Sequence, residues 1–193
     1  EKGLVKAYSI DSVNGWTWMN SRIHASERAR RHEAYDQYVM QEVVPFIWLN
    51  QGNRDGIYTT GASMGAYHAL NFLLRHPTVF GGTVAMSGAY DLTPWTGGYM
   101  DELIYMNSPR HHLPNANDHG YHELLRHRGK GIHILTGQGS YEAPHQSKEI
   151  SDILWSKGIW HNLEMWGHDM PHDWPTWRRM LPAFMRYQTG WAG

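Results

Sequence analysis

The 193-residue chain contains no cysteine, and this absence excludes disulfide bonds, thiolate catalysis and zinc sites with cysteine ligands. Its formal net charge is only −1, which argues against the basic surface of a protein that binds nucleic acid or anionic membranes. No apolar run approaches the roughly 18–20 residues that span a bilayer. Residues 1–9 lack the pattern of a signal peptide, which favours a cytoplasmic location. We therefore expect no nucleic-acid partner and no membrane association.

The residues that are present are typical of a soluble globular protein, with 41% hydrophobic and 18% charged side chains. The length suits a single core, and we predict one domain over residues 1–193. Ten tryptophans and fourteen histidines are many for this length. Aromatic side chains often line pockets for organic substrates, although core packing is their more common role.

Short apolar runs alternate with longer amphipathic segments, which is the pattern of βαβ units. The expected strands are brief, and they cover residues 5–10, 56–60, 82–86, 131–136 and 162–166. The expected helices cover residues 26–48, where Pro45 bends or ends the helix, and residues 64–75, 147–157 and 175–185. The sequence thus predicts an α/β fold in which helices cover a mostly parallel central sheet.

A serine motif lies at the junction of the second expected strand and the helix that follows it. Residues 61–65 read Gly-Ala-Ser-Met-Gly, a GxSxG motif whose turn strains the serine backbone while its two glycines avoid collisions with strand and helix. The backbone N–H of Met64 would donate to a developing oxyanion, and one such donor is commonly worth about 3 kcal/mol. The sequence therefore predicts Ser63 as the nucleophile of a serine hydrolase, in an α/β-hydrolase-like three-layer sandwich.

A serine hydroxyl needs a base with a pKa near 7, and in this fold the histidine comes last in the chain. The segment after the last expected strand offers His168 and His172. Together with Asp169 and Asp173 these histidines could also ligate zinc, but the chain has no helical HExxH motif beside its serine motif. We expect no metal and no cofactor.

Several motifs resemble the esterase family that includes esterase D, feruloyl esterases and the mycolyltransferases. Residues 172–177 read His-Asp-Trp-Pro-Thr-Trp, similar to the element in which that family's catalytic histidine precedes a Trp-(Pro)-x-Trp sequence. The resemblance extends through residues 75–77 (Arg-His-Pro) and Phe80 to residues 86–88 (Met-Ser-Gly). It implies His172 as the base, with His168 as the rival.

The acid of the triad is chosen from the loop that follows the fourth expected strand. The family usually places an aspartate there, but residues 137–142 contain none, and Ser140 stands in its place. Glu142 is therefore the predicted acid, because its longer side chain could reach the histidine. A solvated surface position for Glu142 is the alternative reading, and Asp91 is the second candidate acid.

The candidate pocket residues are three tryptophans. Trp16 and Trp18 follow the first expected strand at its carboxyl end, where ligands bind in open α/β sheets. Trp95 lies in the long connection 92–130, a candidate lid or pocket wall. Plain packing is the alternative for each of them.

The resemblance also implies that part of the sheet is missing. The first expected strand corresponds to the family's fourth, and a strand that should lie between residues 5–10 and 56–60 has no counterpart, although its loop supplies the second oxyanion donor in the family. We expect that roughly 40 N-terminal residues are absent, or that another segment or a second chain completes the sheet. A minimal hydrolase with a rebuilt oxyanion hole is the alternative.

The sequence as a whole predicts a serine esterase that hydrolyses a small-molecule carboxylic ester through an acyl-enzyme on Ser63. The alternatives are an acyltransferase with the same triad and a non-catalytic binding domain of the same fold. The acyl group, the alcohol group and the oligomeric state are left open by the sequence.

Overall fold

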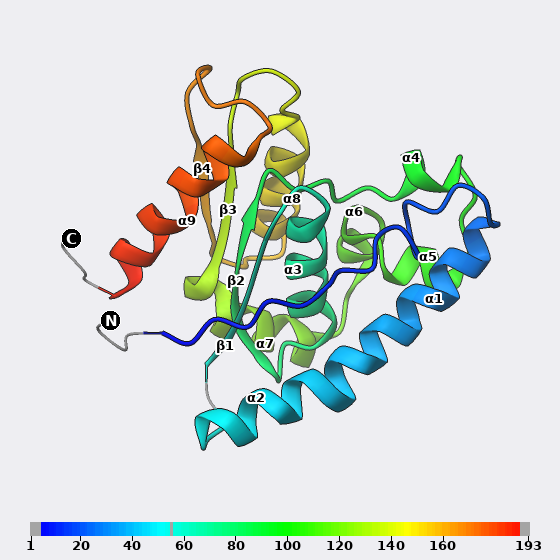
Figure 1. Cartoon of the computed structure of the whole chain (residues 1–193), viewed down its shortest axis with the longest axis horizontal. Helices are drawn as coiled ribbons and strands as arrows, with labels where there is room; N and C mark the ends of the chain where they lie inside the picture. Colours follow the sequence, from blue (N-terminus) through cyan, green and yellow to red (C-terminus); the bar gives the residue numbers. More distant parts are fainter. Residues whose placement is uncertain (1–4, 55, 190–193) are drawn as a thin grey trace.

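Four parallel strands form the centre of the protein (Figure 1). The computed structural model describes residues 5–54 and 56–189, and its strands are β1 (Ile57–Ala62), β2 (Phe80–Met86), β3 (Ile132–Thr136) and β4 (Asn162–Met165). They pair in the order β1-β2-β3-β4, all in parallel, and the mostly parallel sheet is confirmed. Parallel neighbours require crossover connections, and each connection here contains helices.

The helices alternate with the strands along the chain. The crossovers are α3 (Met64–Arg75), α8 (Pro144–Ser156) and, between β2 and β3, the group α4 (Thr93–Thr96), α5 (Glu102–Met106), α6 (Pro109–His112), η2 (Leu113–Asn115), α7 (His119–Arg128) and η3 (Gly129–Gly131). The last helix is α9 (Trp174–Thr189). None of the helices in the described part of the chain combines the length and hydrophobicity that a membrane crossing requires.

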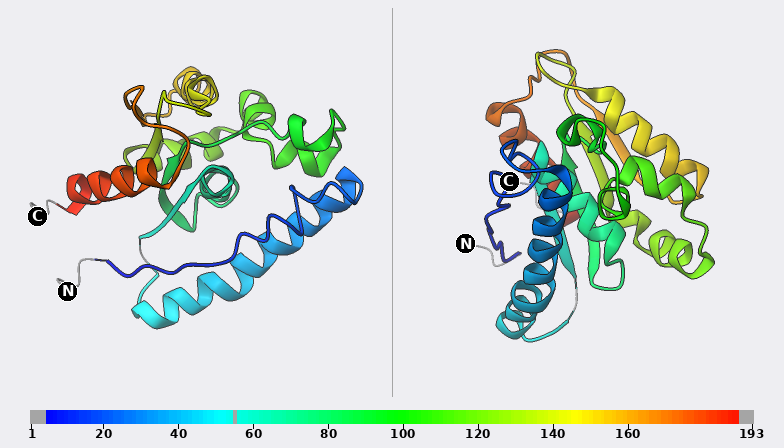
Figure 2. Two further views of the ribbon diagram at one scale, coloured as in Figure 1. Left: turned by 45° about the horizontal axis from the view of Figure 1, so that its top comes forward. Right: turned by 90° about the vertical axis from the view of Figure 1, so that its right-hand side faces the viewer.

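Both faces of the sheet are covered. Alternate residues of the central strands point to opposite faces, and each set packs in its own hydrophobic cluster. On one face Val84 and Met86 of β2 pack with side chains of α9. On the other face Ala85 belongs to a larger cluster with side chains of α3 and α8. The helices therefore lie on the two sides of the sheet seen in Figure 2, and the three-layer arrangement is confirmed.

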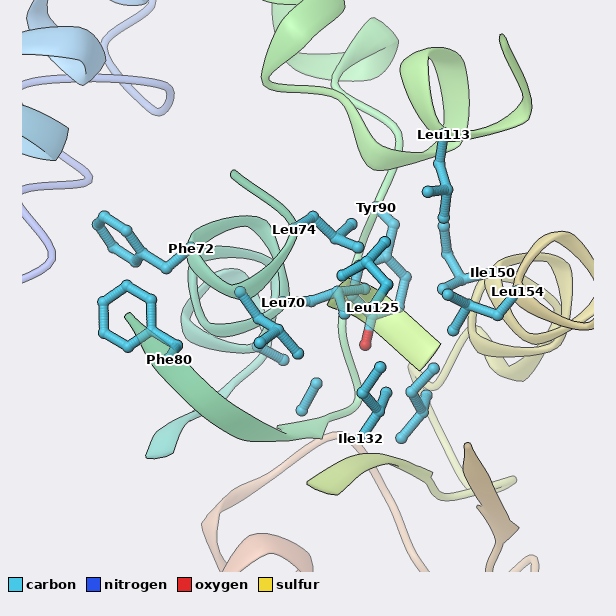
Figure 3. Packing of buried hydrophobic residues seen from close by; sticks show 14 of the residues in the cluster. Leu70, Phe72, Leu74, Phe80, Tyr90, Leu113, Leu125, Ile132, Ile150 and Leu154 are labelled. Atoms are coloured by element: carbon cyan, nitrogen blue, oxygen red, sulfur yellow. The ribbon is translucent and has the colours of Figure 1, made fainter. Parts of the chain in front are cut away.

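The long connection between β2 and β3 contributes to the core. Figure 3 shows Leu113 and Leu125 from this connection close to side chains of α3 and α8, and both are fully buried. Leu92 and Ile104 from the same connection are also fully buried. Residues 92–130 are therefore a packed part of the domain, and their role as a pocket wall stays a prediction.

The expected helix over residues 26–48 is present as a run of three helical elements. These are α1 (Ala25–Tyr38), the π-helical turn η1 (Val39–Val43) and α2 (Val44–Gln51), and His24 caps the start of α1 by accepting from the N–H of Ser26. The wide turn directly precedes Pro45, whose ring would collide with a carbonyl oxygen of a regular preceding turn. The proline therefore changes the helix locally but does not end it.

The expected strand over residues 5–10 is wrong, because the structure assigns this segment no regular secondary structure. The segment runs alongside α2 in Figures 1 and 2, where the Tyr8 hydroxyl donates to Oδ1 of Asn50 at 2.6 Å. The ring of Tyr8 also meets Phe46 edge-on, with ring centroids 6.2 Å apart. An apolar and polar alternation forms a strand only beside a neighbour that accepts its backbone hydrogen bonds, and this segment packs against a helix instead.

The outer edge of β1 has no strand partner among the described residues, since β1 is the first strand in the order of the sheet. Tyr58 on this strand is 48% exposed. That another segment or a second chain completes the sheet beside β1 stays a prediction.

Candidate active site

Ser63 occupies the sharp turn between β1 and α3. Its φ of 55° and ψ of −122° lie outside the conformations that a serine ordinarily adopts. The backbone N–H of Ser63 donates to the carbonyl oxygen of Met86 at 2.9 Å, which ties the turn to the end of β2. The strained strand-to-helix turn that the motif predicts is thus present in the structure.

The two glycines of the motif differ in what a side chain would meet. A Cβ atom at Gly61 would lie 2.4 Å from the carbonyl carbon and oxygen of Gly65, whereas a Cβ atom at Gly65 would meet nothing within 4 Å. The expectation that glycine avoids a collision is therefore confirmed at Gly61 and wrong at Gly65. The tight contact lies between the end of the strand and the backbone of the helix.

Replacing Gly61 with alanine is expected to lower the free energy of unfolding by about 2–3 kcal/mol or more, because the added methyl group meets rigid backbone. Replacing Gly65 with alanine is the matched control, and its effect should be neutral or stabilising, since alanine is favoured over glycine in a helix by about 1 kcal/mol. Urea unfolding of both variants measures the difference. Equal stability of the two variants would contradict the close approach at Gly61.

His172 is the histidine that reaches Ser63. Its Nε2 lies 2.9 Å from Oγ of Ser63, although the two residues are 109 positions apart. His168 is exposed, and its Nδ1 is 3.2 Å from the carbonyl oxygen of Gln138. The structure therefore brings His172, and not His168, to the serine.

Glu142 lies on the other side of the His172 ring. Its Oε2 is 3.4 Å from Nδ1 of His172, and its side chain is only 1% exposed. The contact is an ion-pair distance outside hydrogen-bond geometry, and Nδ1 has no hydrogen-bond partner among the described residues; contacts of this kind often tighten only in the complex with substrate. Burial disfavours the charge of Glu142, but the nearby His172 and the hydrogen bond from Ser87 hold the pKa of the carboxyl below its ordinary value.

Asp91, the second candidate acid, is engaged elsewhere. One of its oxygens accepts from the backbone and side chain of Thr93, and the other accepts from Arg110. Burial acts against its charge, but these partners lower the pKa of the Asp91 carboxyl. The structure thus pairs His172 with Glu142 and pairs Asp91 with Arg110.

The loop of the acid and the loop of the histidine are joined by backbone hydrogen bonds. Gly139 donates to the carbonyl oxygen of Met170 at 3.0 Å, and His172 donates to that of Ser140 at 2.9 Å. A Cβ atom at Gly137 would lie 2.1 Å from the carbonyl oxygen of Met170, so the loops can approach this closely only because Gly137 lacks a side chain. This contact sets Glu142 and His172 side by side.

Ser87 and Trp177, which connect to Glu142 through two hydrogen bonds in series, were missed by the sequence reasoning. The Ser87 hydroxyl donates to Oε1 at 2.6 Å, and the indole N–H of Trp177 donates to Oγ of Ser87 at 3.0 Å. Ser87 follows β2 directly, and the carboxyl ends of neighbouring parallel strands meet at one edge of the sheet. The position of Ser87 directly after an expected strand could have identified it from the sequence, because it places Ser87 near the carboxyl ends of β1 and β3.

Met64 begins α3, and its side chain is 7% exposed in a cluster with Trp18 and Tyr67. The first N–H groups of a helix have no partner within the helix, which leaves the Met64 amide suited to an anion. Its role as an oxyanion donor stays a prediction. A loop from a strand beyond β1, which the resemblance implies as the second donor, is not among the described residues.

The three candidate pocket tryptophans have different surroundings. Trp16 is 46% exposed beneath the guanidinium of Arg31, and Trp95 is partly buried against the cluster that contains Met64. Trp18 is fully buried in the structure, as the alternative of plain packing predicts, and its role in shaping a pocket stays a prediction. The strand that would have placed it at the sheet edge does not form, and Trp18 packs beside Met64 instead. Contact of Trp16 and Trp95 with a substrate stays a prediction.

No group of three or more histidine, aspartate or glutamate side chains in residues 5–54 and 56–189 is arranged to hold a metal ion. The described residues of segment 168–173 instead make separate contacts. His172 faces Ser63, and Asp169 lies 3.8 Å from Arg179.

Comparisons with known proteins concern the fold and the family of the chain. Curated protein sequences give no match. Among solved structures, a ferulic acid esterase aligns with a TM-score of 0.64 and 18% identity over 80% of this chain and 60% of its own. MPT51 of Mycobacterium tuberculosis aligns with a TM-score of 0.56 and 18% identity over 80% of this chain and 67% of its own. An S-formylglutathione hydrolase from Agrobacterium tumefaciens aligns with a TM-score of 0.60 and 14% identity over 81% of this chain and 57% of its own.

These neighbours share the α/β-hydrolase-type fold, and the chain spans about 60% of the length of the ferulic acid esterase. A family model described as "Putative esterase" matches residues 9–187, which is most of the sequence. The chain, with its serine turn and its histidine element both inside the matched region, belongs to this esterase family.

Proposed function

We propose that the protein hydrolyses carboxylic esters through an acyl-enzyme on Ser63. The observation that carries this proposal is the 2.9 Å separation between Oγ of Ser63 and Nε2 of His172. A serine hydroxyl becomes an effective nucleophile when a neutral imidazole accepts its proton during the attack. The membership of the esterase family supports an ester as the substrate.

In the first half of the reaction, Oγ of Ser63 attacks the carbonyl carbon of the ester while its proton moves to Nε2 of His172. The resulting imidazolium is stabilised by the carboxylate of Glu142, which faces Nδ1. The oxyanion of the tetrahedral intermediate accepts from the backbone N–H of Met64. His172 then returns the proton to the leaving alcohol, and the acyl group remains bound to Ser63.

In the second half, water replaces the alcohol. His172 takes a proton from the water as the water oxygen attacks the acyl-enzyme, and it then protonates Oγ as the acid leaves. The same three side chains therefore act twice, and free Ser63 is restored.

The proposal is tested with a fluorophosphonate probe and p-nitrophenyl acetate. Wild-type protein should be labelled on Ser63, and Ser63→Ala should lose the label and at least about 10³-fold of the hydrolysis rate, because the acyl acceptor is removed. Labelling is followed by intact mass and by mass spectrometry of the peptide that contains residue 63.

The matched control is Ser156→Ala, which removes the hydroxyl of an exposed serine on α8 that bonds only the carbonyl oxygen of Ile153. This variant should label and hydrolyse like the wild type. A folded wild type that takes no label, or a label on another residue, would refute the proposal.

A further inference from the structure

The carboxylate of Glu142 is held by side chains that come from two other parts of the fold. Ser87, directly after β2, donates to Oε1 at 2.6 Å. The hydroxyl of Thr136, the last residue of β3, lies 3.3 Å from Oε2 and 3.2 Å from the carbonyl oxygen of Gly137, and these two acceptors share its one proton. Oε2 is also the oxygen that faces Nδ1 of His172 at 3.4 Å. The two oxygens therefore have different neighbours, and only one of them is turned to the histidine.

Trp177, in the first turn of α9, determines the direction of the Ser87 hydroxyl. Its indole N–H donates to Oγ of Ser87 at 3.0 Å, and an indole nitrogen cannot accept a hydrogen bond. Oγ of Ser87 is thus an acceptor toward Trp177, so its own proton is available for Glu142. The same indole meets the ring of His172 edge-on, with centroids 5.0 Å apart and planes at 87°.

Ser87 has a backbone conformation that glycine would adopt more easily than serine. Ser87 has a φ of 54°, in the left-handed region that favours glycine, and it is 5% exposed. Its N–H donates to the carbonyl oxygen of Leu135 at 2.7 Å, which fixes the turn. Glycine would adopt this conformation without strain, so what serine adds at this position is the hydroxyl that reaches Glu142.

We propose that Ser87 is a positioning residue whose hydroxyl, oriented by Trp177, holds the Glu142 carboxylate with Oε2 turned to Nδ1 of His172. This role rests on the proposed function, because a positioned acid matters only if His172 acts as the base. Without the hydroxyl, Oε1 of a nearly inaccessible carboxylate loses its donor, and only the longer contacts of Oε2 with Thr136 and His172 orient the carboxylate. The indole N–H of Trp177 loses its acceptor in the same step.

The central test is Ser87→Gly, which removes the hydroxyl and also relieves the positive φ. We expect kcat for p-nitrophenyl acetate to fall by about 10- to 100-fold while KM stays within about twofold, since a hydrogen bond to a charged group is lost away from the substrate. The pKa of Glu142, followed by ¹³C NMR of protein with labelled glutamate carboxyls, should rise, because one group that stabilises the charge is gone. Relief of the positive φ acts against the loss of two hydrogen bonds, so urea unfolding is used to show that the variant is folded under the assay conditions.

A second variant, Trp177→Phe, keeps a ring beside His172 and removes the N–H that orients Ser87. It should lower kcat in the same direction by about 3- to 10-fold, because a neutral hydrogen bond is weaker than a charged one. Trp155→Phe, at an exposed tryptophan of α8, is the matched control and should leave kcat and the Glu142 pKa unchanged.

The outcomes separate the two proposals. If the wild type hydrolyses the ester and Ser63→Ala does not, a normal kcat and a normal Glu142 pKa in Ser87→Gly would overturn the positioning role alone. A folded but inactive wild type would overturn the proposed function and this role with it. Loss of kcat with a raised Glu142 pKa and an unchanged KM, in a Ser87→Gly protein that is folded under the assay conditions, supports the positioning role against a merely structural one.

Discussion

Replacing His172 with alanine is expected to lower kcat for p-nitrophenyl acetate by about 10⁴-fold or more. In hydrolases of this kind the serine and the histidine act as a unit, and loss of either costs nearly as much as loss of both. Here Nε2 of His172 lies 2.9 Å from Oγ of Ser63, so its removal takes away the group that accepts the hydroxyl proton during the attack. Steady-state kinetics of the folded His172→Ala variant measures the loss. The rate of Ser63→Ala gives the residual hydrolysis that does not depend on the serine.

The control for this prediction is His168→Ala, four residues earlier in the same loop. His168 is exposed and meets the carbonyl oxygen of Gln138, so its removal should change kcat by no more than about twofold. A large loss in His168→Ala together with an active His172→Ala would reverse the assignment of the base.

The parts of the fold that depend on local pattern were predictable from the sequence. The GxSxG motif between an apolar run and an amphipathic segment predicted β1, the turn at Ser63 and α3, and each is present. Residues 5–10 show the same kind of local pattern and form no strand. The difference is the neighbour: β1 pairs with β2, whereas residues 5–10 meet α2, and no local pattern identifies a partner.

The site was predictable to the extent that motif order and loop length determine it. His172 follows β4 and Glu142 follows β3. The carboxyl ends of parallel strands lie at one edge of the sheet, so the loops that begin there lie close together. The contact between Trp177 and Ser87 joins residues 90 positions apart through tertiary packing, and nothing near either residue in the sequence predicts it. The full burial of Trp18 depends in the same way on its cluster with Met64 and Tyr67.

The buried histidines predict a large loss of stability in mild acid. Burial lowers the pKa of His68 to about 4 and that of His112 to about 4. Burial also holds the pKa of His32 well below its ordinary value, and the neighbouring His68 and Arg75 act in the same direction. His32 is surrounded by aromatic rings, with the His68 ring stacked at 5.3 Å between centroids. These three side chains are therefore neutral in the folded protein at pH values where they would be charged in the unfolded chain.

The direction in which stability changes with pH depends on whether the folded or the unfolded state binds more protons. Above about pH 7 neither state protonates these histidines, and they make no pH-dependent contribution to the free energy of unfolding. Between the unfolded pKa of about 6.5 and a folded pKa near 4, the unfolded chain binds protons that the folded protein does not, so stability falls as pH falls. Each such histidine contributes about 1.4 kcal/mol per pH unit in this window, so His68 and His112 together contribute about 4 kcal/mol between pH 7 and pH 5, and His32 acts in the same direction.

A loss of this size approaches the whole stability of an ordinary domain, so the protein should unfold or become marginal near pH 5. Urea unfolding at pH 7, 6 and 5 measures the slope, and His68→Gln, which keeps a donor for Oδ1 of Asn14 without a titrating ring, should reduce it. His119→Gln is the matched control, because its side chain is 82% exposed on α7, and the slope should be unchanged. Stability that stays level from pH 7 to pH 5 would show that these histidines titrate alike in both states. The carboxylates whose pKa is lowered, Glu142 among them, lose their stabilising charge only at lower pH, so this window reports on the histidines.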